Sequence, residues 1–433
     1  METTGFTSSS PLLGFHYRPD DRHYRQDDLA RWLPRLQRLG AQWLVLQAPP
    51  RRAVPEHFLR ELLAAEIWPV LHLDWRPAEL PPLQDVRLLL ETYARWGVRH
   101  VVLFNHPNQR AFWQGGRWAQ QNLVERFLDL FLPLAGEALR AGLTPVFPPL
   151  QTGGDYWDTA FLRAALERMK RRDADGVLHV LVIGAQAWAA DRPVDWGSGG
   201  PERWPGVRPY FTPPDEQDQR GFRVADWYDA VVRSVLAQPR PILLFEMGAL
   251  PGERQVERVL TMSRLLRREA VSGHAPLPDT VVGGAFAWLT GEEDRPAGVR
   301  WYSPDGDPLP LAEAWAQRLA QRASATAKSS PEAAAIRHYV LLPSYEWGIA
   351  EAHWRAVRPL LRLEKPAVGF SLEEARLAQR VTVVGSEQDF PESELRRLRA
   401  AGCVVERILP DGITLASGEG ESIPPERGAY DDK

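Results

Sequence analysis

The stretch PILLFEMG, residues 241–248, places four consecutive apolar residues between a proline and a single carboxylate, Glu246. A short apolar run of this kind is typical of a strand buried on both faces of a parallel sheet. Seven further runs in the chain share the pattern. They are LLGFHY (12–17), QWLVLQ (42–47), WPVLHLD (68–74), HVVLFN (100–105), TPVFPP (144–149), LHVLVIGA (178–185) and VVGGAFAWL (281–289). Eight such strands are the number that closes a barrel of parallel strands.

Longer amphipathic stretches separate these runs and predict helices. Residues 25–40, RQDDLARWLPRLQRLG, repeat their apolar positions every three or four residues and end on Gly40, a typical helix C-cap. Residues 122–142 follow the same pattern and also end on a glycine. The segment 189–220, rich in Pro, Gly and Trp, predicts a long loop over the active face of a barrel. We therefore expect an α/β fold with a (β/α)8 TIM barrel over residues 11–320.

The composition changes after the predicted barrel. Residues 321–335 contain small and polar side chains without an apolar period, which indicates a linker. A second unit is expected over residues 336–415 as a small parallel α/β domain. Its predicted strands are HYVLLPS (338–344), AVGFS (367–371), VTVVGS (381–386) and CVVERI (403–408). The polar tail 416–433 is expected to be disordered.

Composition and charge exclude several classes of partner. The 433 residues carry 52 basic and 56 acidic side chains with signs interspersed, so we expect neither nucleic-acid binding nor attachment to anionic lipid. No apolar stretch reaches the length of a membrane span, and no signal-peptide pattern opens the chain as given. This predicts a cytoplasmic protein, or a cell-surface one if the chain is a fragment. The single cysteine, Cys403, is predicted to be a small buried residue.

Catalytic groups of a barrel lie at the carboxyl ends of its strands, which makes Glu246 the first candidate. Burying a carboxylate at the end of an apolar strand is unfavourable without a partner or a chemical role. The alternative is a structural glutamate bonded to a neighbouring Arg or Trp. The 17 tryptophans favour sugar binding, because flat aromatic faces pack against sugar rings, although core packing explains most of them equally well.

At these residues the chain resembles the clan A glycoside hydrolases, retaining enzymes with two catalytic glutamates after strands four and seven. PILLFEMG resembles the strand-seven pattern, and FNHPN, residues 104–108, resembles the strand-four motif Asn-Glu-Pro. The resemblance implies that Glu246 is the nucleophile and that Asn105 holds the sugar 2-hydroxyl. It covers most of the first 320 residues.

Two further segments extend the resemblance. IGAQAW, residues 183–188, places Gln186 and Trp188 where the family has a His and a Tyr after strand six. FAWL, residues 286–289, places Trp288 where the family has a Trp on the floor of the sugar pocket.

The sequence departs from the family at the acid/base position, where His106 replaces glutamate. A retaining glycosidase needs a second group about 5 Å from its nucleophile to protonate the leaving oxygen and then activate water. A histidine titrates near neutral pH, so His106 is either an atypical acid/base or the mark of lost catalysis. Other acidic candidates near strand ends are Asp74, Asp155, Asp158, Glu292, Glu293 and Asp294.

Further polar residues near strand ends are expected to line the pocket. They are His16, His72 and Asp74, alongside His106. A metal site formed by these four is a weaker alternative, because no tight spacing of ligands appears, and we expect no metal and no cofactor. No P-loop or G-x-S-x-G motif indicates phosphate binding or an esterase nucleophile.

The second unit resembles one repeat of a bacterial cell-wall-binding family over residues 381–408. That resemblance implies a cell-wall polymer as a partner, and a generic accessory domain is the alternative. For the whole chain we expect a carbohydrate-active protein with a carbohydrate ligand or substrate, related to retaining glycoside hydrolases. The alternative is a non-catalytic glycan-binding or cell-wall-associated protein that uses the barrel cleft as a receptor.

Overall fold

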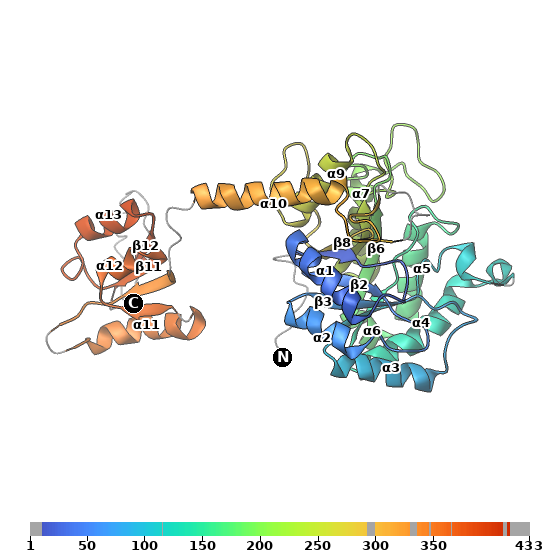
Figure 1. Ribbon diagram of the computed structural model, residues 1–433, viewed down its shortest axis with the longest axis horizontal. Helices are drawn as coiled ribbons and strands as arrows, with labels where there is room; N and C mark the ends of the chain where they lie inside the picture. The colour runs from blue at the N-terminus through green and yellow to red at the C-terminus, as the bar shows by residue number, and fades with distance from the viewer. Residues whose placement is uncertain are drawn as a thin grey trace, which may run out of the picture. The chain divides into compact units, whose positions relative to one another are not determined.

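A computed structural model describes residues 11–114, 116–291, 299–329, 336–345, 348–364, 366–409 and 414–415. The chain divides into two compact units, Met1–Arg318 and Leu319–Lys433 (Figure 1).

The first unit is a closed barrel of eight parallel strands in the order β1 to β8. The strands are β1 (Leu12–His16), β2 (Trp43–Gln47), β3 (Trp68–Leu73), β4 (His100–Leu103), β5 (Thr144–Phe147), β6 (Val182–Trp188), β7 (Ile242–Gly248) and β8 (Val281–Phe286). This arrangement confirms the predicted TIM barrel. All eight apolar runs contain a strand, including the short run 42–47 and the proline-containing run 144–149.

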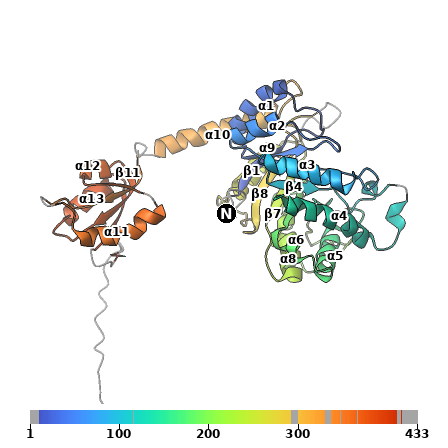
Figure 2. The same cartoon turned by 90° about the horizontal axis from the view of Figure 1, so that it is seen from below.

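Helices cover the outside of the strands, as Figure 2 shows for α3, α4, α5 and α8. The barrel unit contains α1 (Gln26–Leu39), α2 (Glu56–Ala64), α3 (Leu83–Arg95), α4 (Leu123–Arg140), α5 (Asp158–Arg171), α6 (Asp175–Val180), α7 (Gly200–Arg203), α8 (Val224–Leu236), α9 (Gln255–Leu266) and the first part of α10 (Pro310–Ser329), with two 3-10 turns, Arg110–Phe112 and Arg117–Ala119. In α1 the buried residues Leu29, Trp32, Leu36 and Leu39 form the stripe that the spacing predicts. Gly40 ends the helix in the left-handed conformation that glycine favours.

Apolar side chains fill the barrel interior, so the barrel is a packed core rather than a pore. Val45, Val70, Val102, Leu243 and Phe245 are among its buried residues. Trp43 also belongs to this cluster, and a Cβ added at Gly14 would lie 2.4 Å from its indole nitrogen. A glycine is therefore required on β1 for the tryptophan to enter the barrel.

The run 178–185 was expected to be a single strand, and this is wrong for its first residues. Helix α6 continues to Val180, and β6 begins at Val182, which pairs with Val146. The apolar residues Val177 and Leu178 are buried from a helix instead. A buried apolar run has no period that separates a strand from a helix, and its length exceeded what one strand here needs.

The segment 189–220 is mainly irregular, with the four-residue helix α7 inside it. Asp218, fully buried, holds this loop together. It accepts hydrogen bonds from Trp196 Nε1 at 3.1 Å and from the Thr212 hydroxyl at 2.8 Å, and it pairs with Arg220. Burial alone would raise the pKa of Asp218, but these partners lower it to about 2.

Helix α10 continues to Ser329, so the first part of the expected linker 321–335 is helical. Residues 330–335 lie outside the described residues. The same holds for the tail 416–433, which was expected to be disordered.

The second unit contains a five-stranded sheet in the order β10-β9-β11-β12-β13. Its elements are β9 (Ile336–Leu341), α11 (Glu351–Glu364), β10 (Ala367–Gly369), α12 (Leu372–Ala375), β11 (Ala378–Val384), α13 (Glu392–Ala400), β12 (Val404–Ile408) and β13 (Thr414–Leu415). Four strands are parallel and the short β13 is antiparallel, which confirms the expected small parallel α/β domain. Cys403 is buried in its core, as predicted.

Among the described residues, none of the helices has the length and apolar character needed to cross a bilayer.

Candidate active site

Glu246 lies at the carboxyl end of β7 in a left-handed backbone conformation, with φ of 51°. The pairing of β7 with β8 shifts between Leu244 and Met247, and the pairing of β6 with β7 shifts between Gln186 and Trp188. A non-glycine residue held in this region costs about 1 kcal/mol or more, so the surrounding structure must impose it. Such strain is concentrated at functional sites, which makes this strand end the natural place to look for chemistry.

The backbone of Glu246 is held by His16 from the end of β1. The Glu246 N–H donates to His16 Nε2 at 3.0 Å, so this nitrogen is an acceptor and the ring is neutral with its proton on Nδ1. Burial lowers the pKa of His16 to about 4, with Glu246 acting in the opposite direction. His16 therefore remains neutral near pH 7.

The carboxylate of Glu246 is oriented by Gln186 from β6. Gln186 Nε2 donates to Glu246 Oε2 at 2.7 Å, while Gln186 Oε1 accepts from the Thr152 N–H at 3.3 Å. Burial alone would raise the pKa of Glu246, but the nearby His106 and His16 and the Gln186 hydrogen bond outweigh it and lower the pKa. Glu246 is thus a fixed and ionised carboxylate at the mouth of the barrel.

His106 follows β4 and lies close enough to Glu246 for the charges of the two side chains to interact. Its φ is 45°, close to a second left-handed residue, Phe104, with φ of 71°. The His106 N–H donates to the Pro149 carbonyl at 3.1 Å, which fixes the backbone. His106 Nε2 is buried and has no hydrogen-bond partner within the described part of the chain. Burial lowers the pKa of His106, while Glu246 and, more weakly, Asp74 favour its protonated form.

Two other polar atoms near His106 are also buried without a partner, Oδ1 of Asp74 and Oδ1 of Asn105. Buried polar atoms in native proteins are normally satisfied, so exceptions need an explanation such as a missing ligand. Hydroxyl groups of a sugar supply both donors and acceptors at such positions. His72, by contrast, is fully engaged, with Nε2 3.0 Å from the Phe104 carbonyl and Nδ1 3.4 Å from Gln47 Nε2.

The two tryptophans expected in the pocket lie differently. Trp288 is half-buried and meets the His16 ring edge-on, with centroids 5.1 Å apart. Trp188 packs over Gly248, where an added Cβ would lie 2.6 Å from its ring. Trp288 therefore contacts His16, which holds the Glu246 backbone, whereas Trp188 contacts Gly248 at the end of β7.

The alternative acids fall into distinct groups. Asp158 is fully buried and accepts hydrogen bonds from the Gly153 N–H, Gln219 and Tyr228, which makes it a structural carboxylate. Burial raises its pKa to about 6. Asp155 accepts from the Arg110 N–H at 2.9 Å. Glu292, Glu293 and Asp294 lie outside the described residues. Asp74 is the one described candidate adjacent to His106.

Sequence reasoning missed two residues that shape this site. Asn108, fully buried, bonds Gln151 and the Tyr156 carbonyl through both ends of its amide and ties the loop after β4 to the loop after β5. Its place directly after His-Pro was the available signal. Arg18, 5% exposed, lies two residues after His16, and a lone arginine after a strand gives no signal in sequence.

The four side chains considered as a metal site, His16, His72, Asp74 and His106, do not form one. Within the described ranges no group of three or more His, Cys, Asp or Glu residues is arranged to hold a metal ion.

Comparison with known proteins gives a likeness of fold. No family model and no curated protein matches the sequence. The structure is similar to a GH39 enzyme from Xanthomonas axonopodis pv. citri, with a TM-score of 0.45 and 16% identity over 72% of this chain and 67% of that one. A monomeric β-xylosidase from Caulobacter crescentus CB15 gives a TM-score of 0.45 and 16% identity over 72% and 69% of the two chains. An endo-β-1,3-glucanase from Amycolatopsis mediterranei, in complex with laminaritriose, gives 0.40 and 16% over 71% and 99%. At this level the likeness assigns no activity and no residue.

Proposed function

We propose that the barrel is a carbohydrate-active site of the retaining glycosidase type, with Glu246 as nucleophile. The observation that carries this proposal is the support given to Glu246 from two sides, by His16 on its backbone and Gln186 on its carboxylate. A lowered pKa keeps the carboxylate ionised, as a nucleophile requires. A structural glutamate would instead neutralise its charge with an Arg or Lys, and no ion pair of Glu246 occurs in the described part of the chain.

In the proposed first step a Glu246 carboxylate oxygen attacks the anomeric carbon. The bond from that carbon to the leaving oxygen breaks, and protonated His106 gives its proton to that oxygen. In the second step neutral His106 takes a proton from water as the water oxygen attacks the anomeric carbon. The ester to Glu246 then breaks and the carboxylate is restored.

His106 fits this role with a restriction. Its imidazole Nε2 has no protein partner, so it is available to a leaving oxygen or a water. Its lowered pKa leaves little imidazolium near pH 7, which weakens the acid step more than the base step. We therefore expect substrates with good leaving groups to react far better than ordinary glycosides.

The test is a panel of aryl glycosides with very good leaving groups, assayed with and without azide on the wild type and on Glu246→Gln. Such substrates depart without an acid, and azide attacks a glycosyl-enzyme without a general base. We expect azide-accelerated turnover that Glu246→Gln abolishes. Asp155→Asn is the matched control, because it neutralises a carboxylate on a neighbouring loop. Full activity in Glu246→Gln would refute the nucleophile assignment.

A second candidate is a non-catalytic glycan receptor, favoured by the histidine at the acid/base position. The unpartnered atoms of Asp74 and Asn105 would bind sugar hydroxyls equally well without any bond cleavage. In this proposal the second unit serves as an attachment module, with a cell-wall polymer as its partner. Calorimetry with polysaccharides and cell-wall fragments would show affinity without product, and absence of binding across the panel would count against it.

A further inference from the structure

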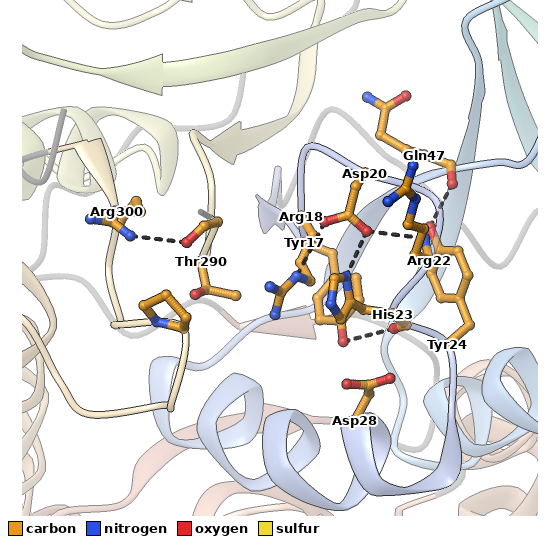
Figure 3. Close-up of polar contacts among 12 residues, drawn as sticks. Tyr17, Arg18, Asp20, Arg22, His23, Tyr24, Asp28, Gln47, Thr290 and Arg300 are labelled. Atoms are coloured by element: carbon orange, nitrogen blue, oxygen red, sulfur yellow. Dashed lines mark hydrogen bonds and ion pairs between the residues drawn. The ribbon is translucent and has the colours of Figure 1, made fainter. Parts of the chain in front are cut away.

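The segment after β1 contains Arg18, which lies two residues beyond the strand end at the barrel mouth. Tyr17 packs outward against Phe58 and Trp32, with ring centroids 5.6 and 6.4 Å apart. Its N–H donates to the Val45 carbonyl at 3.0 Å, so the extended pairing of β1 continues through this residue. Side chains alternate along extended chain, which places Arg18 on the same side as His16, about 7 Å further along. Figure 3 shows the Arg18 side chain pointing from this loop toward Thr290.

The guanidinium of Arg18 is buried with few partners. In the described part of the chain, Arg18 Nε donates a hydrogen bond to Asp20 Oδ2 at 3.4 Å. Asp20 is shared, because it also accepts from the Arg22 N–H at 3.0 Å and lies 2.6 Å from His23 Nδ1 (Figure 3). An arginine has five donors, so within the described residues Arg18 has donors beyond the one that bonds Asp20. Its side chain is only 6% exposed, and its ion pair with Asp20, at 3.4 Å, leaves other donors of the guanidinium available to a further anion.

A second buried arginine lies on the neighbouring segment after β8. Arg300 is 6% exposed, donates from Nη1 to the Gly291 carbonyl at 2.9 Å, and has a buried Nε without a partner. The two arginine segments touch at Gly291, where an added Cβ would lie 3.4 Å from Pro19 and 4.0 Å from Arg300. Within the described ranges Arg300 has no carboxylate partner. The segments that carry these two arginines thus meet at Gly291, five residues after the end of β8.

We propose that Arg18 and Arg300 form a subsite for an anionic substituent on the sugar, a uronic acid carboxylate or a sulfate or phosphate ester. Arginine binds such planar or tetrahedral anions through paired donors, and burial strengthens the interaction. This inference rests on the proposed function, because it extends the sugar site from Glu246 along β1. It selects charged glycans over their neutral counterparts.

The experiment measures binding with matched sugars on the full chain carrying Glu246→Gln, which prevents turnover. Calorimetry compares methyl glucuronide with methyl glucoside, methyl galacturonide with methyl galactoside, and each neutral sugar with its 6-sulfate and 6-phosphate. We expect at least one anionic sugar to bind about 10- to 100-fold more tightly than its neutral partner, and salt to weaken the preference. A carboxylate preference identifies a uronic acid, and an ester preference identifies a sulfated or phosphorylated sugar.

Three arginine variants complete the test. Arg18→Gln and Arg300→Gln should each remove most of the anionic preference. Arg22→Gln is the matched control, because it removes the same charge from an exposed side chain on the same loop and should change nothing. Thermal unfolding checks each variant, and if Arg18→Gln does not fold, Arg18→Lys keeps the charge, loses the paired donors and should still reduce the preference.

The outcomes separate this proposal from the catalytic one. Equal binding of anionic and neutral sugars, or an unchanged preference in folded Arg18 and Arg300 variants, overturns the subsite even if Glu246 proves to be the nucleophile. Selective binding of anionic sugars that the variants abolish supports the subsite even if no glycoside is hydrolysed.

Discussion

The ends of β4 and β7 both lie at the mouth of the barrel and are built differently. At β7 the candidate nucleophile, Glu246, has its backbone held by His16 of β1 and its carboxylate held by Gln186 of β6. At β4 the backbone of His106 is also fixed, but its imidazole Nε2 and the Asn105 amide oxygen have no hydrogen-bond partner among the described residues. Under the proposed function, this difference corresponds to a nucleophile that is positioned before substrate arrives and an acid/base side that the substrate itself completes.

Among the variants outside Glu246 itself, the largest effect should come from changing His106. We expect His106→Ala to slow hydrolysis of glycosides with poor leaving groups by about 10²- to 10⁴-fold, the usual contribution of general acid/base catalysis. Glycosides with very good leaving groups should lose much less, and azide should restore part of the rate. Steady-state rates against leaving-group pKa measure this directly. Equal losses for all leaving groups would show that His106 acts only in binding.

A smaller effect should follow from replacing His16, which holds the backbone of Glu246. Replacing it with Ala removes the acceptor for the Glu246 N–H and should lower kcat about 10- to 100-fold with little change in KM, because a misplaced nucleophile attacks poorly. Since His16 acts through Glu246, its conservative variant His16→Asn should retain more activity than His16→Ala. A rise in KM with kcat unchanged would instead make His16 a sugar-binding residue.

The pH dependence distinguishes the two strand ends more subtly. The pKa of His106 is lowered by burial and that of Glu246 by its histidine neighbours and Gln186, against the effect of burial. Hydrolysis of poor leaving groups needs imidazolium and carboxylate together, and both pKa values are lowered, so the rate should keep rising as pH falls below the ordinary histidine pKa of 6.5 and decline only below the ordinary glutamate pKa of 4.5. With very good leaving groups the rise should vanish. A rate that increases toward alkaline pH would contradict this assignment.

The smallest effect on activity should come from a carboxylate outside the site. Glu137 on α4 is buried and pairs with Arg87 and Arg140, which lower its pKa to about 2. Its folded pKa is depressed, so its contribution to stability is present above pH 4.5 and is lost as pH falls toward 2. Glu137→Gln should lower the thermal midpoint at pH 7, much less at pH 3, and leave azide-dependent turnover unchanged. Loss of turnover without loss of stability would contradict the separation of structural and functional carboxylates.

Sequence alone predicted the barrel and supplied the candidate site residues, because apolar runs and the residues that end them are local features. Glu246, His106 and His16 all lie at strand ends that could be read from the chain. The left-handed backbone at Phe104, His106 and Glu246 could not be read, since it depends on irregular pairing between strands. Local pattern also misplaced the start of β6, because Val177 and Leu178 are equally apolar in a helix.

The hydrogen bonds that Glu246 makes with Gln186 and His16 could not be predicted from the sequence either. Gln186 reaches Glu246 across 60 positions of the chain, and His16 does so across 230. Arg18 and Arg300 are buried by contacts between distant segments, and a sequence shows only two ordinary arginines there.

The most direct test of the account is covalent trapping of the nucleophile. A panel of 2-deoxy-2-fluoro aryl glycosides with very good leaving groups should accumulate a glycosyl-enzyme, because the fluorine slows its breakdown and His106 is a weak general base. Intact-protein mass spectrometry followed by peptide mapping should show one sugar attached to Glu246 in the wild type and none in Glu246→Gln. Attachment to another residue, or turnover of the parent glycosides without any adduct at Glu246, would contradict its role as nucleophile.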